Sequence, residues 1–178
     1  MAKERILFMC ARNASRSQMV EGFFRDFYGD EFDAYSAGSD PQKIDPIAVQ
    51  VMAEVGIDIS KQTSNSLNDY KGQEFDYVII ICGNEYGACP FFFGGKKVFL
   101  ECLKDIYPFN GPETEEIELL REIRDEIGDW VQDFFNKQIK TGLETRPKEG
   151  CCDPEESTDD CECCGPTDSK QNKQSTTK

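Results

Sequence analysis

A cysteine and an arginine near the N-terminus have the types and spacing to bind and attack a tetrahedral oxyanion. Cys10 follows the apolar run 6–9, which predicts a buried strand, and five residues separate it from Arg16. From Ser17 onward, apolar residues recur at helical spacing as far as Phe27. The predicted order is therefore strand, loop and helix. A loop at a helix N-terminus points backbone N–H groups into one concavity with positive potential.

The chemistry of this loop follows from its residue types. Arg16 can bind two oxygens of an oxyanion at once, and the local field favours the thiolate form of Cys10, which could then attack the central atom. Ser17 could donate a hydrogen bond to that thiolate. The expected cradle comprises Ala11, Arg12, Asn13, Ala14, Ser15 and Arg16. The competing interpretation is a buried structural cysteine beside a surface arginine.

Composition narrows the class of protein. The chain has 178 residues, which suits one domain, and its net charge of −14 argues against binding nucleic acid. It has no histidine, so a Cys-His mechanism and a histidine-ligated metal are excluded. We find no signal peptide or membrane span. Nine cysteines without a secretory signal indicate a reducing cytoplasm, in which thiols serve chemistry or metal binding.

Alternating elements predict the α/β class. Apolar runs at 32–37, 75–81 and 98–100 indicate three more strands, and helical spacing begins at Asp45-Pro46 and near Glu113. We expect the helix after Asp45 to end at Gly56. The predicted architecture is a three-layer α/β/α fold around a four-stranded parallel sheet. Ligands of such sheets bind at the carboxyl ends of the strands, where Cys10 should lie.

The segment from Cys10 to Gly22 resembles the low-molecular-weight tyrosine phosphatase family, and more narrowly its thioredoxin-coupled arsenate reductase branch. Ser36-Ala37-Gly38 and the segment 55–60 resemble that branch too. The resemblance covers about residues 4–140. It implies a phosphatase-like arsenate reductase domain over residues 1–140, followed by an acidic, cysteine-rich tail over 141–178.

A second pair of cysteines follows the strand at 75–81. Cys82 should lie near Cys10, and Gly83 and Gly87 make the loop toward Cys89 flexible. The resemblance implies that Cys10, Cys82 and Cys89 form a disulfide relay. Cys10 would attack arsenic, Cys82 would release arsenite, and a thioredoxin-like reductant would reset a Cys82–Cys89 disulfide. By spacing alone, Cys82 and Cys89 could instead be two small buried residues.

The resemblance also implies a general acid and a potassium site. The family's acid is an aspartate before a proline, which is missing here. Asp105 is the best candidate, although counting back from the last helix places Asn110-Gly111 there instead. Positions like Asn13, Glu21, Ser36 and Asn65 contribute to the potassium site. Asn65 stands where potassium-binding members have aspartate, so a ligand charge is lost.

The tail beyond residue 140 is expected to be disordered alone, since it has one aliphatic residue and no aromatic apart from its cysteines. Its thiols could capture a soft ion, zinc or arsenite, or exchange disulfides with Cys82 and Cys89. These thiols are Cys151, Cys152, Cys161, Cys163 and Cys164. We expect Cys102, at the end of the fourth strand, to be structural.

Three functions remain open at this point. The first is a cytoplasmic, monomeric arsenate reductase that requires no cofactor. The second is a phosphatase that hydrolyses phosphoesters through a Cys10 phosphocysteine. The same loop serves both, but Cys82 and Cys89 favour reduction. The third is a non-catalytic, thiol-rich protein that binds metals or metalloids, as the tail suggests.

Overall fold

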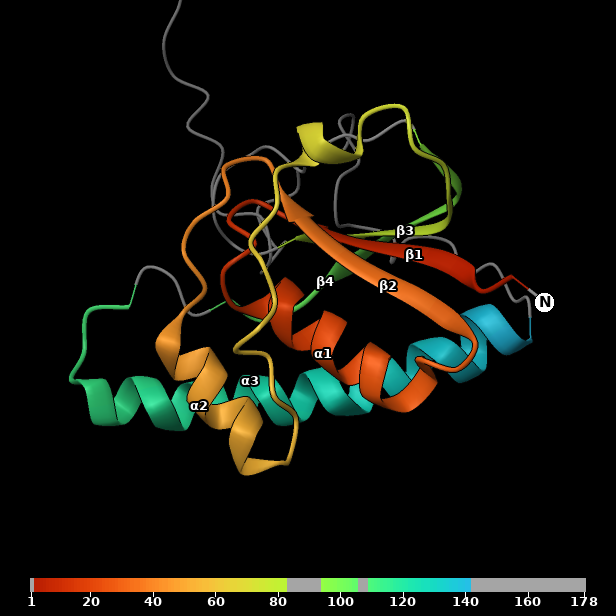
Figure 1. The fold of residues 1–178 in the computed structure, drawn as a ribbon. Coiled ribbons are helices and arrows are strands. Elements are labelled where there is room, and N and C mark those ends of the chain that lie inside the picture. The colour runs from red at the N-terminus through yellow and green to blue at the C-terminus, as the bar shows by residue number, and fades with distance from the viewer. Residues whose placement is uncertain (1, 83–93, 106–108, 142–178) are drawn as a thin grey trace, which may run out of the picture.

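A computed structural model describes residues 2–82, 94–105 and 109–141. Its centre is a four-stranded sheet with the strand order β2-β1-β3-β4 (Figure 1). Every neighbouring pair of strands is parallel, so all four strands end at the same edge. The strands are β1 (Glu4–Cys10), β2 (Phe32–Gly38), β3 (Phe75–Cys82) and β4 (Gly95–Cys102). The predicted α/β class and four-stranded parallel sheet are confirmed.

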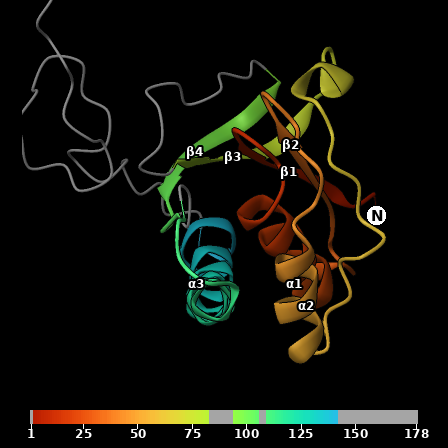
Figure 2. The same cartoon turned by 90° about the vertical axis from the view of Figure 1, so that its left-hand side faces the viewer.

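The three α-helices cover one face of the sheet. Helices α1 (Arg16–Tyr28), α2 (Pro46–Glu54) and α3 (Glu113–Phe134) lie together below one face (Figure 2). A π-helical turn, Phe135–Lys140, continues α3. In the described residues the other face carries the short 3-10 helix η1 (Leu67–Tyr70). None of the helices in the described part of the chain is long and apolar enough to cross a membrane.

The two faces of β1 show why the sheet is buried on both sides. Ile6 and Phe8 pack with the core on the helix face, whereas Leu7 and Met9 pack with the core under η1. All four side chains are fully buried. A strand buried on both faces reads as a continuous apolar run, which is the pattern of residues 6–9. The central position of β1 therefore places Cys10 at the middle of the carboxyl edge.

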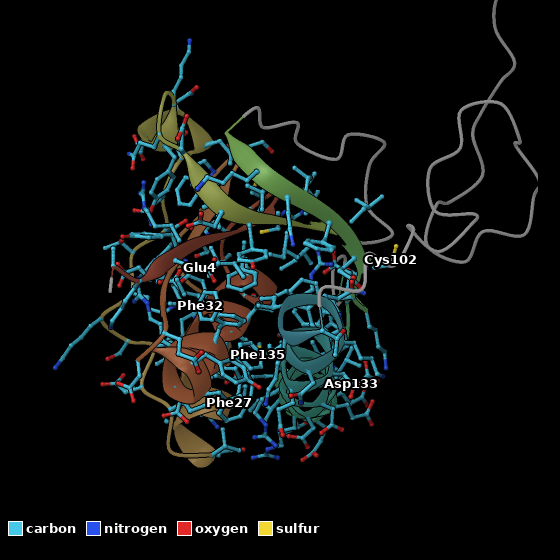
Figure 3. The ribbon with its side chains drawn as sticks, turned by 90° about the vertical axis from the view of Figure 1, so that its right-hand side faces the viewer. Glu4, Phe27, Phe32, Cys102, Asp133 and Phe135 are labelled. Carbon is cyan, nitrogen blue, oxygen red and sulfur yellow. The ribbon has the colours of Figure 1, made fainter. Side chains whose placement is uncertain are left out.

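An aromatic cluster fixes the end of the molecule opposite that edge. Figure 3 shows Phe32 and Phe135 directed into the space between the sheet and the helices, and their ring centroids lie 5.9 Å apart. Tyr28 stacks on Phe135 at 3.7 Å. These contacts hold the C-terminal end of α1 against the π-helical turn. The N-terminal end of α1 is left at the carboxyl edge of the sheet.

The start of α2 and the ends of β4 can be compared with their predicted positions. Asp45 caps α2 as predicted, accepting a hydrogen bond from the Ile47 amide at 2.8 Å. Strand β4 extends beyond the predicted 98–100 at both ends. The apolar pattern underestimated its length, because polar residues such as Lys97 and Glu101 interrupt that pattern. An edge strand tolerates such residues, and the backbone pairing with β3 defines it instead.

Candidate oxyanion-binding site

The loop of residues 10–16 joins β1 to α1, and Cys10 lies at its base. The Cys10 side chain is buried, with 5% of its surface exposed, and its thiol is free. Its Sγ accepts a hydrogen bond from the Asn13 backbone N–H at 3.0 Å. The Ser17 hydroxyl lies 3.0 Å from the same sulfur. Ser17 Oγ accepts a hydrogen bond from Asn13 Nδ2, so its own proton can point to Cys10. Two hydrogen-bonding partners therefore hold the Cys10 sulfur at the base of the loop.

Asn13 gives the loop its shape. Among the described residues it is the non-glycine residue with a positive φ, at 49°, a conformation that asparagine tolerates better than most residues. Its side chain is fully buried. Besides Ser17, its Nδ2 donates to Ser36 Oγ at 2.8 Å, and its Oδ1 accepts from the Asn65 backbone N–H at 2.8 Å. One buried amide therefore ties the loop to β2 and to the segment before η1.

The carbonyl groups of the loop point outward, toward the segment 39–45. Backbone N–H groups of that segment donate to the carbonyls of Cys10, Ala11, Arg12 and Ala14 at distances of 2.7–3.3 Å. In a peptide unit the N–H points opposite to the carbonyl. The loop's amides are consequently directed toward its inside, and α1 begins there too. That arrangement provides an anion-binding concavity.

Two residues that the sequence analysis did not assign to the site help to build it. A Cβ atom on Gly38 would lie 2.7 Å from the Ala11 carbonyl oxygen, so only glycine lets β2 approach the loop this closely. Asp45, predicted only as a helix cap, also accepts a hydrogen bond from Ser15 Oγ at 3.1 Å. The buried Asp45 thus couples the loop to the start of α2. Of these two residues, only Gly38 was part of a sequence segment that resembles the family, Ser36-Ala37-Gly38.

Arg16 joins the loop to the segment after β4. Its guanidinium donates to the Leu103 carbonyl at 3.0 Å and forms an ion pair with the Asp105 carboxylate. The Arg16 and Asp105 side chains are mostly buried, at 12% and 6% exposure. The structure therefore brings the two predicted residues together. Arg12 lies half-buried on the same loop.

The second predicted cysteine lies at the same edge of the sheet, at the end of the strand next to β1. Cys82 is the last residue of β3 and pairs in register with Cys102 of β4. Figure 3 shows Cys102 at the end of β4, and it is disulfide-bonded. Cys89 and the five tail cysteines lie outside the described residues. Asn110 lies in the segment before α3, and the acid that pairs with Arg16 is Asp105.

The residues expected at a potassium site are also close together. Asn13, Ser36 and Asn65 share hydrogen bonds, and Glu21 is buried beside Ser36 on α1. Burial raises the pKa of the Glu21 carboxyl, while hydrogen bonding from Ser36 and the charge of Arg25 oppose that rise. Glu21 Oε1 pairs with Arg25 at 2.7 Å. Within the described segments, no group of three or more cysteines or acids is arranged to hold a metal ion.

Known proteins share both the sequence and the fold. Residues 5–144 match the family model of the low molecular weight phosphotyrosine protein phosphatases. An arsenate reductase from Halalkalibacterium halodurans is 39% identical over 82% of this chain and 99% of its own length. A solved arsenate reductase in its phosphate-binding state has a TM-score of 0.60 at 28% identity, covering 75% of this chain and 98% of that one.

A thioredoxin-dependent arsenate reductase from Corynebacterium glutamicum is similar as well. Its TM-score is 0.58 at 26% identity, and the match covers 79% of this chain and 64% of that one. The match to the family model spans most of the chain, including the loop, the sheet and α3. By this match and the geometry of the loop, the chain belongs to the low molecular weight phosphotyrosine protein phosphatase family, and it resembles the arsenate reductases within it.

Proposed function

We propose that this protein is an arsenate reductase whose nucleophile is Cys10. The observation that carries the proposal is the Cys10 thiol at the base of the oxyanion loop, with hydrogen bonds from the Asn13 amide and the Ser17 hydroxyl. A thiolate held there lies below the concavity in which a tetrahedral oxyanion would bind. The similarity to arsenate reductases favours arsenate over other oxyanions.

The first step is attack by the Cys10 thiolate on arsenic(V). A bond forms between Cys10 Sγ and arsenic, and one arsenate oxygen leaves as water. Asp105 is the proposed proton donor, because Arg16 holds its carboxyl at the mouth of the loop. An incoming oxyanion would compete for the Arg16 guanidinium and free the Asp105 carboxylate. That carboxylate would take up a proton from the bound hydrogen arsenate and pass it to the departing oxygen, which leaves as water.

The second step moves two electrons to arsenic. The Cys82 thiolate attacks Cys10 Sγ, and the electron pair of the sulfur–arsenic bond leaves with arsenic, which departs as arsenite. A Cys10–Cys82 disulfide remains. The position of Cys82 at the end of β3, on the strand next to β1, supports this assignment. Cys89 would then attack Cys82, which releases the Cys10 thiolate and leaves a Cys82–Cys89 disulfide.

A cytoplasmic, thioredoxin-like dithiol would complete the cycle by reducing the Cys82–Cys89 disulfide. The similarity to a protein that is described as thioredoxin-dependent supports this choice of reductant. We propose that the enzyme acts as a monomer and needs no cofactor. Capture of zinc or arsenite by the tail thiols remains a prediction. A chain ending at Thr141 should keep single-turnover reduction and lose tight arsenite binding if that prediction holds.

A second candidate function is phosphoester hydrolysis through a Cys10 phosphocysteine. The family model that matches this chain describes phosphatases. Phosphate is also tetrahedral and anionic like arsenate, so we expect the same loop to accept it. The two functions share Cys10, Arg16 and Asp105, but hydrolysis needs neither Cys82 nor Cys89. A side activity on small phosphoesters is therefore compatible with arsenate reduction.

Two parallel assays on one preparation test the proposal. We expect arsenate-dependent oxidation of reduced thioredoxin, with p-nitrophenyl phosphate hydrolysis weak or undetectable. Efficient hydrolysis without any arsenate turnover would favour the phosphatase. Phosphate should also raise the Tm of the wild type, because a ligand that binds only the native loop stabilises the fold. The Arg16→Ala variant should lose most of that increase.

A further inference from the structure

The segment 63–66 braces the oxyanion loop through contacts separate from those of the segment 39–45. The Asn65 backbone N–H donates to Asn13 Oδ1, and the Asn65 carbonyl accepts from the Gly38 N–H at 2.9 Å. Gly38 also pairs with Ser66 as an isolated parallel bridge. Asn65 therefore contacts both the residue that shapes the loop and the glycine that lets β2 approach it.

The orientation of the Asn65 side chain follows from its partners. Its Nδ2 donates to the Ser36 carbonyl at 3.2 Å and to the Thr63 carbonyl at 3.0 Å. Its Oδ1 lies 3.0 Å from Thr63 Oγ1, which donates to it. Carbonyl oxygens only accept hydrogen bonds, so an amide oxygen would be repelled where Nδ2 now lies. The amide nitrogen of Asn65 thus faces Ser36.

This arrangement does not fit a potassium ion. An alkali cation needs several oxygen atoms directed at one point. Here Asn13 directs its amide N–H to Ser36 Oγ, while its Oδ1 already accepts N–H groups from Asn65 and Gln18. Amide donors converge on Ser36, where a cation would require acceptors. Among the atoms of these residues in the described structure, only Glu21 Oε2 is buried without a hydrogen-bond partner.

We propose that Asn65 is a positioning residue that braces the oxyanion loop by amide hydrogen bonds in place of an alkali cation. The loop's shape, its anion affinity and its activity should then be independent of potassium. An aspartate at this position would lose both N–H donors and face the carbonyls of Ser36 and Thr63 with a negative charge. Together with Glu21 Oε2, it would form a cluster of oxygens that a cation could neutralise. Asn65→Asp should therefore create a potassium requirement.

The test compares the wild type with Asn65→Asp and Asn65→Ala in choline chloride and in potassium chloride at equal ionic strength. The readouts are Tm, the Tm increase caused by inorganic phosphate, and kcat and KM for arsenate. Asn68→Asp is the matched control, because it adds the same charge at an exposed asparagine three residues away. The activity readout rests on the proposed function, whereas the two thermal readouts test the inference without it.

We expect the wild type and Asn68→Asp to give the same values in both salts. Asn65→Ala should lose about 3–6 °C in Tm and raise KM more than it lowers kcat, in both salts alike. Asn65→Asp should lose at least as much in choline chloride and recover most of it in potassium chloride. A wild type whose Tm or phosphate response rises with potassium, or an Asn65→Asp variant that ignores potassium, would overturn the proposal.

Discussion

The oxyanion loop and the end of β4 meet at one edge of the sheet but are held in different ways. Most of the loop is buried, and its carbonyls and the Asn13 side chain bond to three neighbouring segments. Asp105, at the end of β4, reaches the loop through the guanidinium of Arg16, which also binds the Leu103 carbonyl. Arg16 is itself an oxyanion ligand in the proposed mechanism. Binding of the oxyanion should therefore leave the loop in place and change the contacts of Asp105.

The largest effect should come from the base of the loop. Cys10→Ser should lower arsenate reduction and any phosphatase activity by a factor of about 10³ or more, because serine has no accessible anion at neutral pH. Steady-state assays with both substrates measure this loss. Ala53→Ser, at an exposed position on α2, is the control and should keep its turnover. Retained activity of the Cys10→Ser variant would rule out the thiolate mechanism.

Asp105→Asn should be the next most damaging change. Loss of a general acid costs about 10²-fold in rate, whereas the loop that binds the oxyanion should remain intact. We expect a lower single-turnover rate with a phosphate-induced increase in Tm at least as large as in the wild type, because Arg16 loses the carboxylate that competes with phosphate. Asp26→Asn removes an exposed acid from α1 and serves as the control. Full activity in Asp105→Asn would reopen the assignment of the acid near Asn110.

Asp45, which couples the loop to the start of α2, should affect stability more than chemistry. Asp45→Ala removes a helix cap and the acceptor for Ser15, which should lower Tm by about 3–8 °C and weaken phosphate binding. Thermal unfolding with and without phosphate measures both effects. Asp58→Ala removes an exposed aspartate that accepts a backbone hydrogen bond from Ser60, so it is a matched comparison. Equal phosphate responses in the two variants would mean that Asp45 does not support the loop.

The smallest effect concerns pH. Burial raises the pKa of Glu21 in the folded protein, so the folded state binds this proton more tightly than the unfolded chain does. This group's contribution to stability is therefore present below its unfolded pKa and decreases as pH rises through its folded pKa. Glu21→Gln removes that dependence. Urea unfolding from pH 4 to 8 should show the variant gaining stability relative to the wild type as pH rises, and a constant difference would contradict this account.

The sequence predicted the strand, loop and helix around Cys10 because a buried parallel strand and an amphipathic helix leave distinct apolar patterns. It also placed Asp45 as a cap, since Asp-Pro at a helix start is a local signal. It did not predict that Asp45 binds Ser15 or that Asn65 braces Asn13. Those contacts join segments that are distant in the chain, so no local pattern encodes them.

Mapping disulfides during turnover with arsenate tests the central claim most directly. Wild-type enzyme that is mixed with arsenate and no reductant should yield arsenite and a Cys82–Cys89 disulfide, with Cys10 free. Cys89→Ser should stop at a Cys10–Cys82 disulfide after one turnover, and Cys82→Ser should stop before arsenite is released. Arsenite formation with all three thiols still reduced, or normal cycling of Cys82→Ser with thioredoxin, would contradict the relay.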